Sequence, residues 1–91
     1  MIQVTVEVSN PSGLHARPGA LLVRAARTFA SRILVRYGTK TANAKSIVDV
    51  LSLGVGYGAT IVLEADGPDA PEAIQSLRQL FASETDDPHF T

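Results

Sequence analysis

The segment with the clearest chemical potential is Gly13-Leu14-His15-Ala16-Arg17-Pro18, where a glycine-containing loop leads into an expected helix. His15 falls close to the N-cap of that helix, where backbone N–H groups are free and the helix macrodipole is positive. An anion held there would meet those N–H groups, and the guanidinium of Arg17 could neutralise it through paired donors. A neutral imidazole offers a free ring nitrogen as a nucleophile. A lone histidine at a helix start is more often a surface residue, but this combination predicts a histidine that accepts a phosphoryl group.

The spacing of the apolar residues predicts the elements that position this segment. Alternating apolar and polar residues indicate strands, whereas apolar residues three and four positions apart indicate helices. We expect strands at 2–8, 33–37, 40–43 and 60–65, helices at 16 to about 30 and at 47–53, and a last helix after Asp69 that buries residues up to Phe81. The order β-α-β-β-α-β-α predicts an α+β open-faced sandwich, in which helices pack on one face of a four-stranded, mainly antiparallel sheet.

Local signals mark several boundaries between these elements. Gly38-Thr39 fits a two-residue hairpin turn. Ser46 and Asp49 have the spacing of a capping box at the start of the short helix, and Gly54 would end that helix. The segment 54–58 is rich in glycine, but it follows a helix and precedes a strand, which is the wrong context for a nucleotide-binding loop. We interpret it as a helix stop and a flexible turn.

The composition excludes several kinds of site. The chain of 91 residues has no cysteine and only two histidines, so we expect no disulfide, no metal site and no cofactor. It has no apolar run of the about 20 residues that a membrane span needs, and its start lacks the pattern of a signal peptide. We therefore expect a cytoplasmic protein that does not insert into the membrane.

Charge is distributed unevenly along the chain. The first 45 residues carry seven of the eight basic residues and one acidic residue, whereas the remainder carries eight of the nine acidic residues. This asymmetry predicts a basic face that meets an acidic partner or a phosphorylated group. A solvated surface on which the two signs happen to segregate would give the same pattern.

The sequence resembles the HPr family, the histidine-containing phosphocarrier proteins of the phosphoenolpyruvate-dependent sugar phosphotransferase system. The resemblance rests on Gly13-Leu14-His15-Ala16-Arg17-Pro18, which matches the family's active-site signature, and extends through Lys40-Thr41, Ala44-Lys45-Ser46-Ile47 and Leu51-Ser52-Leu53-Gly54. It covers roughly residues 2–84 and implies the family fold. It therefore implies one phosphocarrier domain over residues 1–84, followed by an acidic tail at 85–91. The tail has no counterpart in the family, and we interpret its His89 as inert.

The resemblance implies a phosphoryl relay. Phosphorylated enzyme I would transfer its phosphoryl group to Nδ1 of His15, and the carrier would then deliver the group to the IIA domain of a sugar permease. Arg17 would stabilise the phosphoryl group. The chain would act as a stoichiometric carrier and would turn over no small molecule by itself. We expect it to be a monomer.

The resemblance also implies a docking surface and a regulatory site. The docking surface would comprise Arg24, Arg27, Lys45, Ile47, Val48 and Leu51. Ser46 corresponds to the serine that an HPr kinase/phosphorylase phosphorylates in Gram-positive members, although a helix N-cap is a sufficient structural reason for a serine there. A phosphate at Ser46 would add negative charge beside the basic docking surface. Asp49 departs from the glycine or lysine common at its position and brings a negative charge into this surface.

Three other functions remain open at this stage. A carrier that only regulates, in an incomplete or nitrogen-linked phosphotransferase chain, would have the same residues. A small acyl-phosphate hydrolase would need a glycine-rich phosphate cradle after the first strand, where this chain has one glycine. A nucleic-acid-binding module would carry aromatic residues on its central strands, and the five aromatic residues here are mostly elsewhere, so we expect no nucleic-acid partner.

Overall fold

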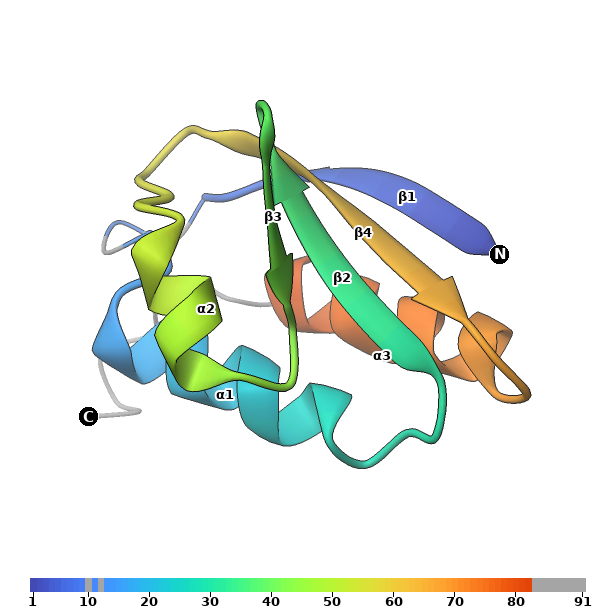
Figure 1. The fold of residues 1–91 in the computed structure, drawn as a ribbon. Coiled ribbons are helices and arrows are strands. Elements are labelled where there is room, and N and C mark those ends of the chain that lie inside the picture. Colours follow the sequence, from blue (N-terminus) through green and yellow to red (C-terminus); the bar gives the residue numbers. More distant parts are fainter. Residues whose placement is uncertain (10, 12, 83–91) are drawn as a thin grey trace.

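The computed structural model describes residues 1–9, 11 and 13–82 (Figure 1). The elements occur in the expected order: β1 (Ile2–Glu7), α1 (Ala16–Ala26), β2 (Arg32–Tyr37), β3 (Lys40–Asn43), α2 (Ile47–Ser52), β4 (Thr60–Asp66) and α3 (Ala70–Ala82). The predicted α+β class and element order are confirmed. The expected domain boundary at 84, the tail at 85–91 and His89 lie outside the described residues.

The four strands form one sheet in the order β1-β4-β2-β3, and every neighbouring pair is antiparallel. The last strand in the sequence, β4, therefore lies between β1 and β2. Tyr37 is paired with Lys40, which leaves Gly38 and Thr39 as the predicted two-residue turn. Gly38 has a φ of 63°, a conformation that a two-residue hairpin turn requires and that glycine adopts without strain.

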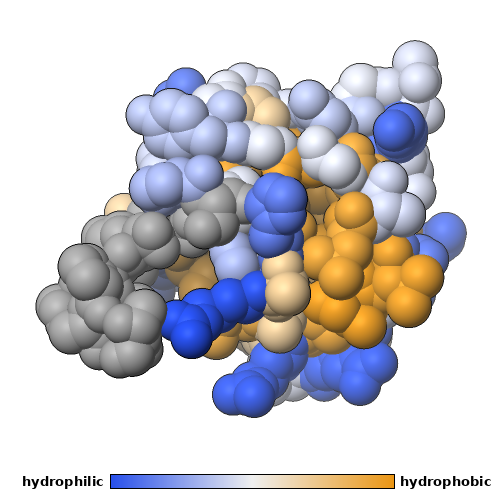
Figure 2. Space-filling model, turned by 90° about the vertical axis from the view of Figure 1, so that its left-hand side faces the viewer, coloured by the Kyte–Doolittle hydropathy of each residue, from blue (hydrophilic) through white to orange (hydrophobic). Residues whose placement is uncertain are grey.

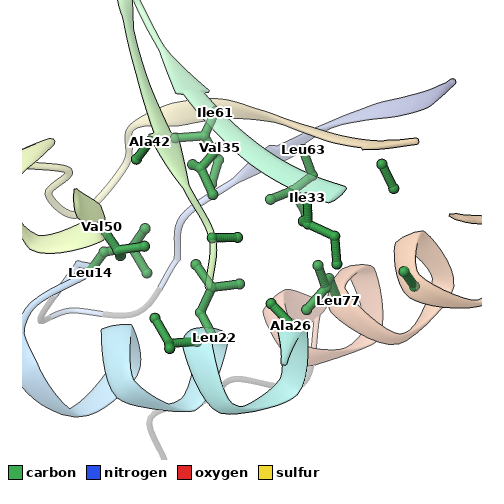
Figure 3. Close-up of a cluster of buried hydrophobic side chains, with 14 of the residues drawn as sticks. Leu14, Leu22, Ala26, Ile33, Val35, Ala42, Val50, Ile61, Leu63 and Leu77 are labelled. Atoms are coloured by element: carbon green, nitrogen blue, oxygen red, sulfur yellow. The ribbon is translucent and has the colours of Figure 1, made fainter. Parts of the chain in front are cut away.

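The core lies between one face of the sheet and the helices. Figure 1 shows α1 and α3 beneath the sheet and α2 at one end of this helical layer, where it contacts α1 and β3. The labelled side chains in Figure 3 come from all of these layers and point toward one another. They are Leu14, Leu22, Ala26, Ile33, Val35, Ala42, Val50, Ile61, Leu63 and Leu77, each at most 4% exposed. Burial of this apolar surface fixes how α1 and α2 sit against the sheet.

Helix α1 ends earlier than the sequence predicts, at Ala26 instead of near residue 30. The N–H groups of Thr28 and Phe29 donate to carbonyl groups three residues back, which tightens the last turn. The next two N–H groups, of Ala30 and Ser31, donate to the carboxylate of Asp69 at 2.8 and 2.9 Å. The Asp69 side chain, which directly precedes α3, therefore takes N–H groups that a longer helix would use.

Other element boundaries differ by one residue from the prediction. Strand β1 ends at Glu7, β2 starts at Arg32, β4 extends to Asp66, and α2 ends at Ser52. Terminal residues of helices and strands are set by side-chain and turn contacts that periodicity does not encode.

The sheet face away from the helices carries one buried charge. Glu64 lies in β4 between the core residues Leu63 and Ala65, so it points to the opposite face, yet its side chain is only 7% exposed. Its carboxylate accepts a hydrogen bond from the guanidinium of Arg36 in β2 and forms an ion pair with it. A buried carboxylate needs such a partner. The charges of Glu64 and Arg36 therefore neutralise each other on the sheet face opposite the helices.

The Asp69 cluster predicts a pH-dependent part of the stability. The Ser31 hydroxyl donates to the Asp69 carboxylate at 2.5 Å, and together with the N–H group of Ala30 it holds the pKa of Asp69 below its usual 3.8. A folded-state pKa below the unfolded one stabilises the fold above the unfolded pKa, and this contribution is lost as the pH falls through the folded pKa. The free-energy difference between the wild type and Asp69→Asn should therefore shrink as the pH falls from about 6 to about 3.

Urea denaturation across this pH range measures the difference. Ser31→Ala keeps the carboxylate and removes the strongest of its hydrogen bonds, so its pH dependence should fall between those of the wild type and Asp69→Asn. If the wild type and Asp69→Asn lose stability in parallel as the pH falls, Asp69 does not have this role.

Candidate functional site

The loop that carries His15 is attached to the loop between α2 and β4. The N–H group of Leu14 donates to the carbonyl oxygen of Val55 at 2.9 Å. Gly13 has a φ of 62°, and a Cβ atom at this position would lie 2.5 Å from that same oxygen and 2.7 Å from the Cα atom of Gly56. Only glycine fits both the conformation and the space. The glycine of the sequence motif is therefore needed for a backbone contact.

The loop between α2 and β4 also forms backbone hydrogen bonds at its C-terminal end, with Val8. The N–H group of Gly58 donates to the carbonyl oxygen of Val8 at 2.7 Å, and the N–H group of Val8 donates to the carbonyl oxygen of Ala59 at 2.8 Å. Gly54, with a φ of 69°, ends α2 as predicted. Hydrogen bonds near both ends of segment 54–58 connect it to the residues that precede α1.

His15 is the N-cap residue of α1, as the sequence predicts. Its backbone is extended, with φ −84° and ψ −160°, and its carbonyl oxygen accepts the N–H group of Gly19 at 2.7 Å. The imidazole makes no capping hydrogen bond and is exposed. Within the described part of the chain, the N–H groups of Ala16 and Arg17 have no acceptor. The ring is free for chemistry at a helix end with free donors.

The electrostatics of this helix end favour an anion. The first turn of α1 contains no acidic residue, so the positive end of the macrodipole is not compensated within the helix. Arg17 lies in that turn, is exposed, and forms no ion pair with another described residue. The two residues that the sequence singles out therefore share one helix turn, with the guanidinium available to an incoming group.

A close contact between helices places α2 beside this end of α1. A Cβ atom at Gly19 would lie 3.2 Å from Cδ2 of Leu51 and 3.5 Å from Cδ1 of Ile47, so the absence of a side chain at Gly19 lets the two helices approach. Ile47 is half-buried and packs against the core. Leu51 and Val48 remain 40% and 71% exposed. The sequence reasoning missed Gly19, whose position inside a helix was the available signal.

Figure 2 shows the end of the molecule that carries α2 and the start of α1. Hydrophobic side chains gather in one area of this face, next to hydrophilic ones. We call Ile47, Val48 and Leu51 of α2 the apolar patch. It adjoins the first turns of α1 through the contact at Gly19.

Ser46 is the N-cap of α2, but the predicted capping box is incomplete. The Ser46 hydroxyl oxygen accepts the N–H group of Asp49 at 3.3 Å. The reciprocal bond does not form, because the N–H group of Ser46 donates to the carbonyl oxygen of Asn43 at 3.0 Å. The Asp49 carboxylate instead accepts the N–H group of Asn43 at 3.4 Å. Ser46 thus has the structural role that its residue type suggests, and its side chain is only half-buried.

Two of the three basic residues expected at the docking surface form hydrogen bonds through their side chains. Nε of Arg27 donates to the carbonyl oxygen of Lys45 at 2.9 Å, and Nζ of Lys45 donates to the carbonyl oxygen of Phe29 at 2.6 Å. These two bonds connect the end of α1 to the segment before α2, a task that the sequence does not reveal. Arg24 is exposed and forms no hydrogen bond or ion pair within residues 1–9, 11 and 13–82.

The described residues offer no alternative site for metal chemistry. They contain no group of three or more histidine, aspartate or glutamate side chains that could hold a metal ion. In the same part of the chain, none of the helices has both the length and the apolar character to cross a membrane.

A family model described as the PTS HPr component phosphorylation site matches residues 2–83. The chain belongs to the HPr family. It is 42% identical over 81 residues to the phosphocarrier protein HPr of Treponema pallidum (strain Nichols), which covers 89% of this chain and 92% of that protein. Members of this family are the phosphocarrier proteins of the phosphotransferase system, and this chain is an HPr phosphocarrier of that kind.

Solved structures of HPr proteins share the fold closely. HPr-C-His from Thermoanaerobacter tengcongensis is 46% identical, with a TM-score of 0.92 over 96% of this chain and 98% of that one. HPr from Bacillus anthracis str. Ames is 41% identical, with a TM-score of 0.85 over 88% of this chain and 95% of that one. The family resemblance and the fold predicted from the sequence are both confirmed.

The close contact at Gly13 predicts that a single methyl group added at this position displaces the loop that carries His15. Gly13→Ala should lose about 1–3 kcal/mol from left-handed backbone strain, and more from the collision with Val55. Gly38→Ala is the matched control, because Gly38 has nearly the same φ and no atom within 4 Å of the added Cβ. Urea denaturation measures the stability of both variants, and NMR spectra report the amide signals of His15 and Arg17.

We expect Gly13→Ala to lose more stability than the control and to shift these amide signals. The control should leave them unchanged. Equal effects of the two substitutions would show that the loop contact does not position His15.

Proposed function

We propose that His15 receives a phosphoryl group from phosphorylated enzyme I and passes it to IIA domains of sugar permeases. The observation that carries this proposal is the exposed imidazole of His15 at the N-cap of α1, which makes no capping hydrogen bond. Membership of the HPr family supports it, since the family model is named for a phosphorylation site. The relay would operate in the cytoplasm, with residues 1–84 as the carrier domain and no metal or cofactor required.

Each transfer exchanges one bond to phosphorus for another. The lone pair of a ring nitrogen of His15, Nδ1 by analogy with the family, attacks the phosphorus atom while its bond to the donor protein breaks. Delivery to the IIA domain reverses these roles, so His15 returns to its starting state. The N–H groups at the start of α1 and the guanidinium of Arg17 would stabilise the charge on the phosphoryl oxygens.

The stabilisation must be modest for a carrier. An exposed arginine and a solvated helix end interact weakly with an anion compared with a buried site, because water screens them. A phosphoryl group on His15 would therefore persist long enough to diffuse between partners and still be given up. This balance suits a relay better than it suits a hydrolase, which would hold a phosphoryl group for attack by water.

The partners would dock on the apolar patch and the neighbouring basic residues. Val48 and Leu51 expose apolar surface, and the half-buried Ile47 packs against the core. Arg24, Arg27 and Lys45 would all supply positive charge that attracts an acidic partner. The bonds of Arg27 and Lys45 to backbone carbonyl groups hold those two side chains in place without neutralising them. Hydrophobic contacts at the centre and charges at the rim are the usual composition of a transient interface.

Ser46 would serve as a regulatory site for a kinase of the HPr kinase/phosphorylase type. Its hydroxyl is half-buried at the start of α2, directly before the apolar patch. A phosphate there would add about −1.5 to −2 charge and place it within the docking surface. Repulsion of an acidic enzyme I would follow without a change of fold.

The central test is incubation with enzyme I and phosphoenolpyruvate, followed by intact mass measurement before and after acid treatment. The wild type should gain one phosphate that acid removes, and His15→Ala should gain none. Arg17→Ala should gain the same phosphate more slowly, because it keeps the nucleophile and loses a stabilising charge. Thermal unfolding of both variants should match that of the wild type, since both side chains are exposed. Acid-labile phosphate on His15→Ala would refute the proposal.

The docking model predicts a salt-dependent effect at Ser46. Ser46→Asp should bind enzyme I more weakly than the wild type at low salt, by about three- to tenfold, and the difference should shrink as salt screens the charges. Ser46→Asn retains a capping side chain without the charge and is the matched control. Titration calorimetry at two ionic strengths measures both. Equal weakening by aspartate and asparagine would point to lost capping in place of repulsion.

A further inference from the structure

Two side-chain hydrogen bonds in opposite directions join the end of α1 to the segment before α2. Nε of Arg27, the C-cap residue of α1, donates to the carbonyl oxygen of Lys45 at 2.9 Å. Nζ of Lys45 donates in return to the carbonyl oxygen of Phe29 at 2.6 Å. Both donors are cations, and a hydrogen bond from a charged donor is stronger than one between neutral groups. We call these two bonds the Arg27–Lys45 link.

Helix α2 and the segment before it therefore meet α1 at two separate points (Figure 1). Near the start of α1, Gly19 lies against the side chains of Leu51 and Ile47. At the end of α1, Arg27 holds Lys45, two residues before α2 begins. Gly19 and Arg27 are about two helix turns apart. One contact alone would let α2 turn about it, whereas two contacts at this separation fix its direction.

The other bonds of this segment do not attach it to α1. The N–H group of Lys45 donates to Oδ1 of Asn43 at 2.9 Å, and the N–H group of Ser46 donates to the carbonyl oxygen of Asn43 at 3.0 Å. These bonds lie within the turn. The N–H group of Ala44 donates to β2 at 2.9 Å, which ties the turn to the sheet. The bond from Arg27 thus sets how the turn, and α2 after it, lie relative to α1.

We propose that Arg27 is a positioning residue for the docking of enzyme I, because its bond to the Lys45 carbonyl group fixes α2 and its apolar patch relative to His15. This inference rests on the proposed function, in which enzyme I covers the apolar patch while His15 receives the phosphoryl group. It gives Arg27 a role that a positive charge alone cannot fulfil, since the bond needs an N–H donor at the position of Nε. The chemical step stays with His15 and Arg17.

Two substitutions separate this hydrogen bond from the charge. Arg27→Gln removes the charge and places an amide N–H donor at the same number of bonds from Cα as Nε of arginine. Arg27→Lys keeps the charge and places a methylene group there. NMR spectra report the amide signals of residues 44–52, and steady-state transfer from enzyme I at two ionic strengths reports KM and kcat. Arg78→Lys is the matched control, because Arg78 is exposed on α3 and forms no ion pair with another described residue.

The two variants should behave in opposite ways. Arg27→Lys should shift the amide signals of residues 44–52 and raise KM about three- to tenfold at both ionic strengths, because the hydrogen bond is lost and the charge is kept. Its kcat should stay within about twofold of the wild type, since the reacting groups are unchanged. Arg27→Gln should keep these amide signals and raise KM at low salt only. Arg78→Lys should match the wild type in both measurements.

The outcomes separate this inference from the proposed function. If Arg27→Lys leaves the amide signals and KM unchanged, Arg27 acts only through its charge and the inference is wrong. A fall in kcat without a change in KM, or equal amide shifts in Arg27→Lys and Arg27→Gln, would also overturn it. The proposed function stands in each of these cases, provided that the wild type accepts phosphate on His15. If the wild type accepts none from enzyme I, both fail. Well-dispersed NMR spectra of the variants show that a raised KM does not reflect unfolding.

Discussion

The site depends on a backbone contact between two loops. Gly13 and Leu14 pack so closely against Val55 and Gly56 that Gly13 has no room for a Cβ atom. This contact sets where α1 begins and therefore where His15 lies. The contact at Gly19 then brings α2 to the same end of α1. The exposed histidine, the N–H groups at the start of α1 and the apolar patch therefore lie at the same end of α1.

Two charged clusters that stabilise the fold lie away from His15. The ion pair of Glu64 with Arg36 lies on the sheet face away from the helices, and the Asp69 cluster lies where β2 begins and α3 begins. The end that carries His15 exposes apolar side chains of α2 next to hydrophilic ones. A carrier must bind several partners in turn, which favours an exposed surface whose shape is fixed by its backbone.

Periodicity and capping signals were sufficient for the fold, because each element buries one apolar face and these faces have regular spacing. They could not predict the end of α1, which depends on Asp69, a residue distant in sequence. The motif predicts His15 and Arg17 as site residues, since the chemistry proposed for them is local to one helix turn. The bond of Leu14 to Val55 and the bond of Lys45 to Phe29 were not predictable, because each joins segments that no local pattern connects.

The central claim is that a ring nitrogen of His15 carries the phosphoryl group. NMR spectroscopy of protein with ¹⁵N-labelled histidine, phosphorylated by enzyme I and phosphoenolpyruvate, tests it at the level of the bond. The account predicts that one ring nitrogen of His15 couples to phosphorus, that the amide signals of Ala16 and Arg17 shift, and that the ring signals of His89 do not change. Incorporated phosphate without a coupled His15 nitrogen would contradict the account.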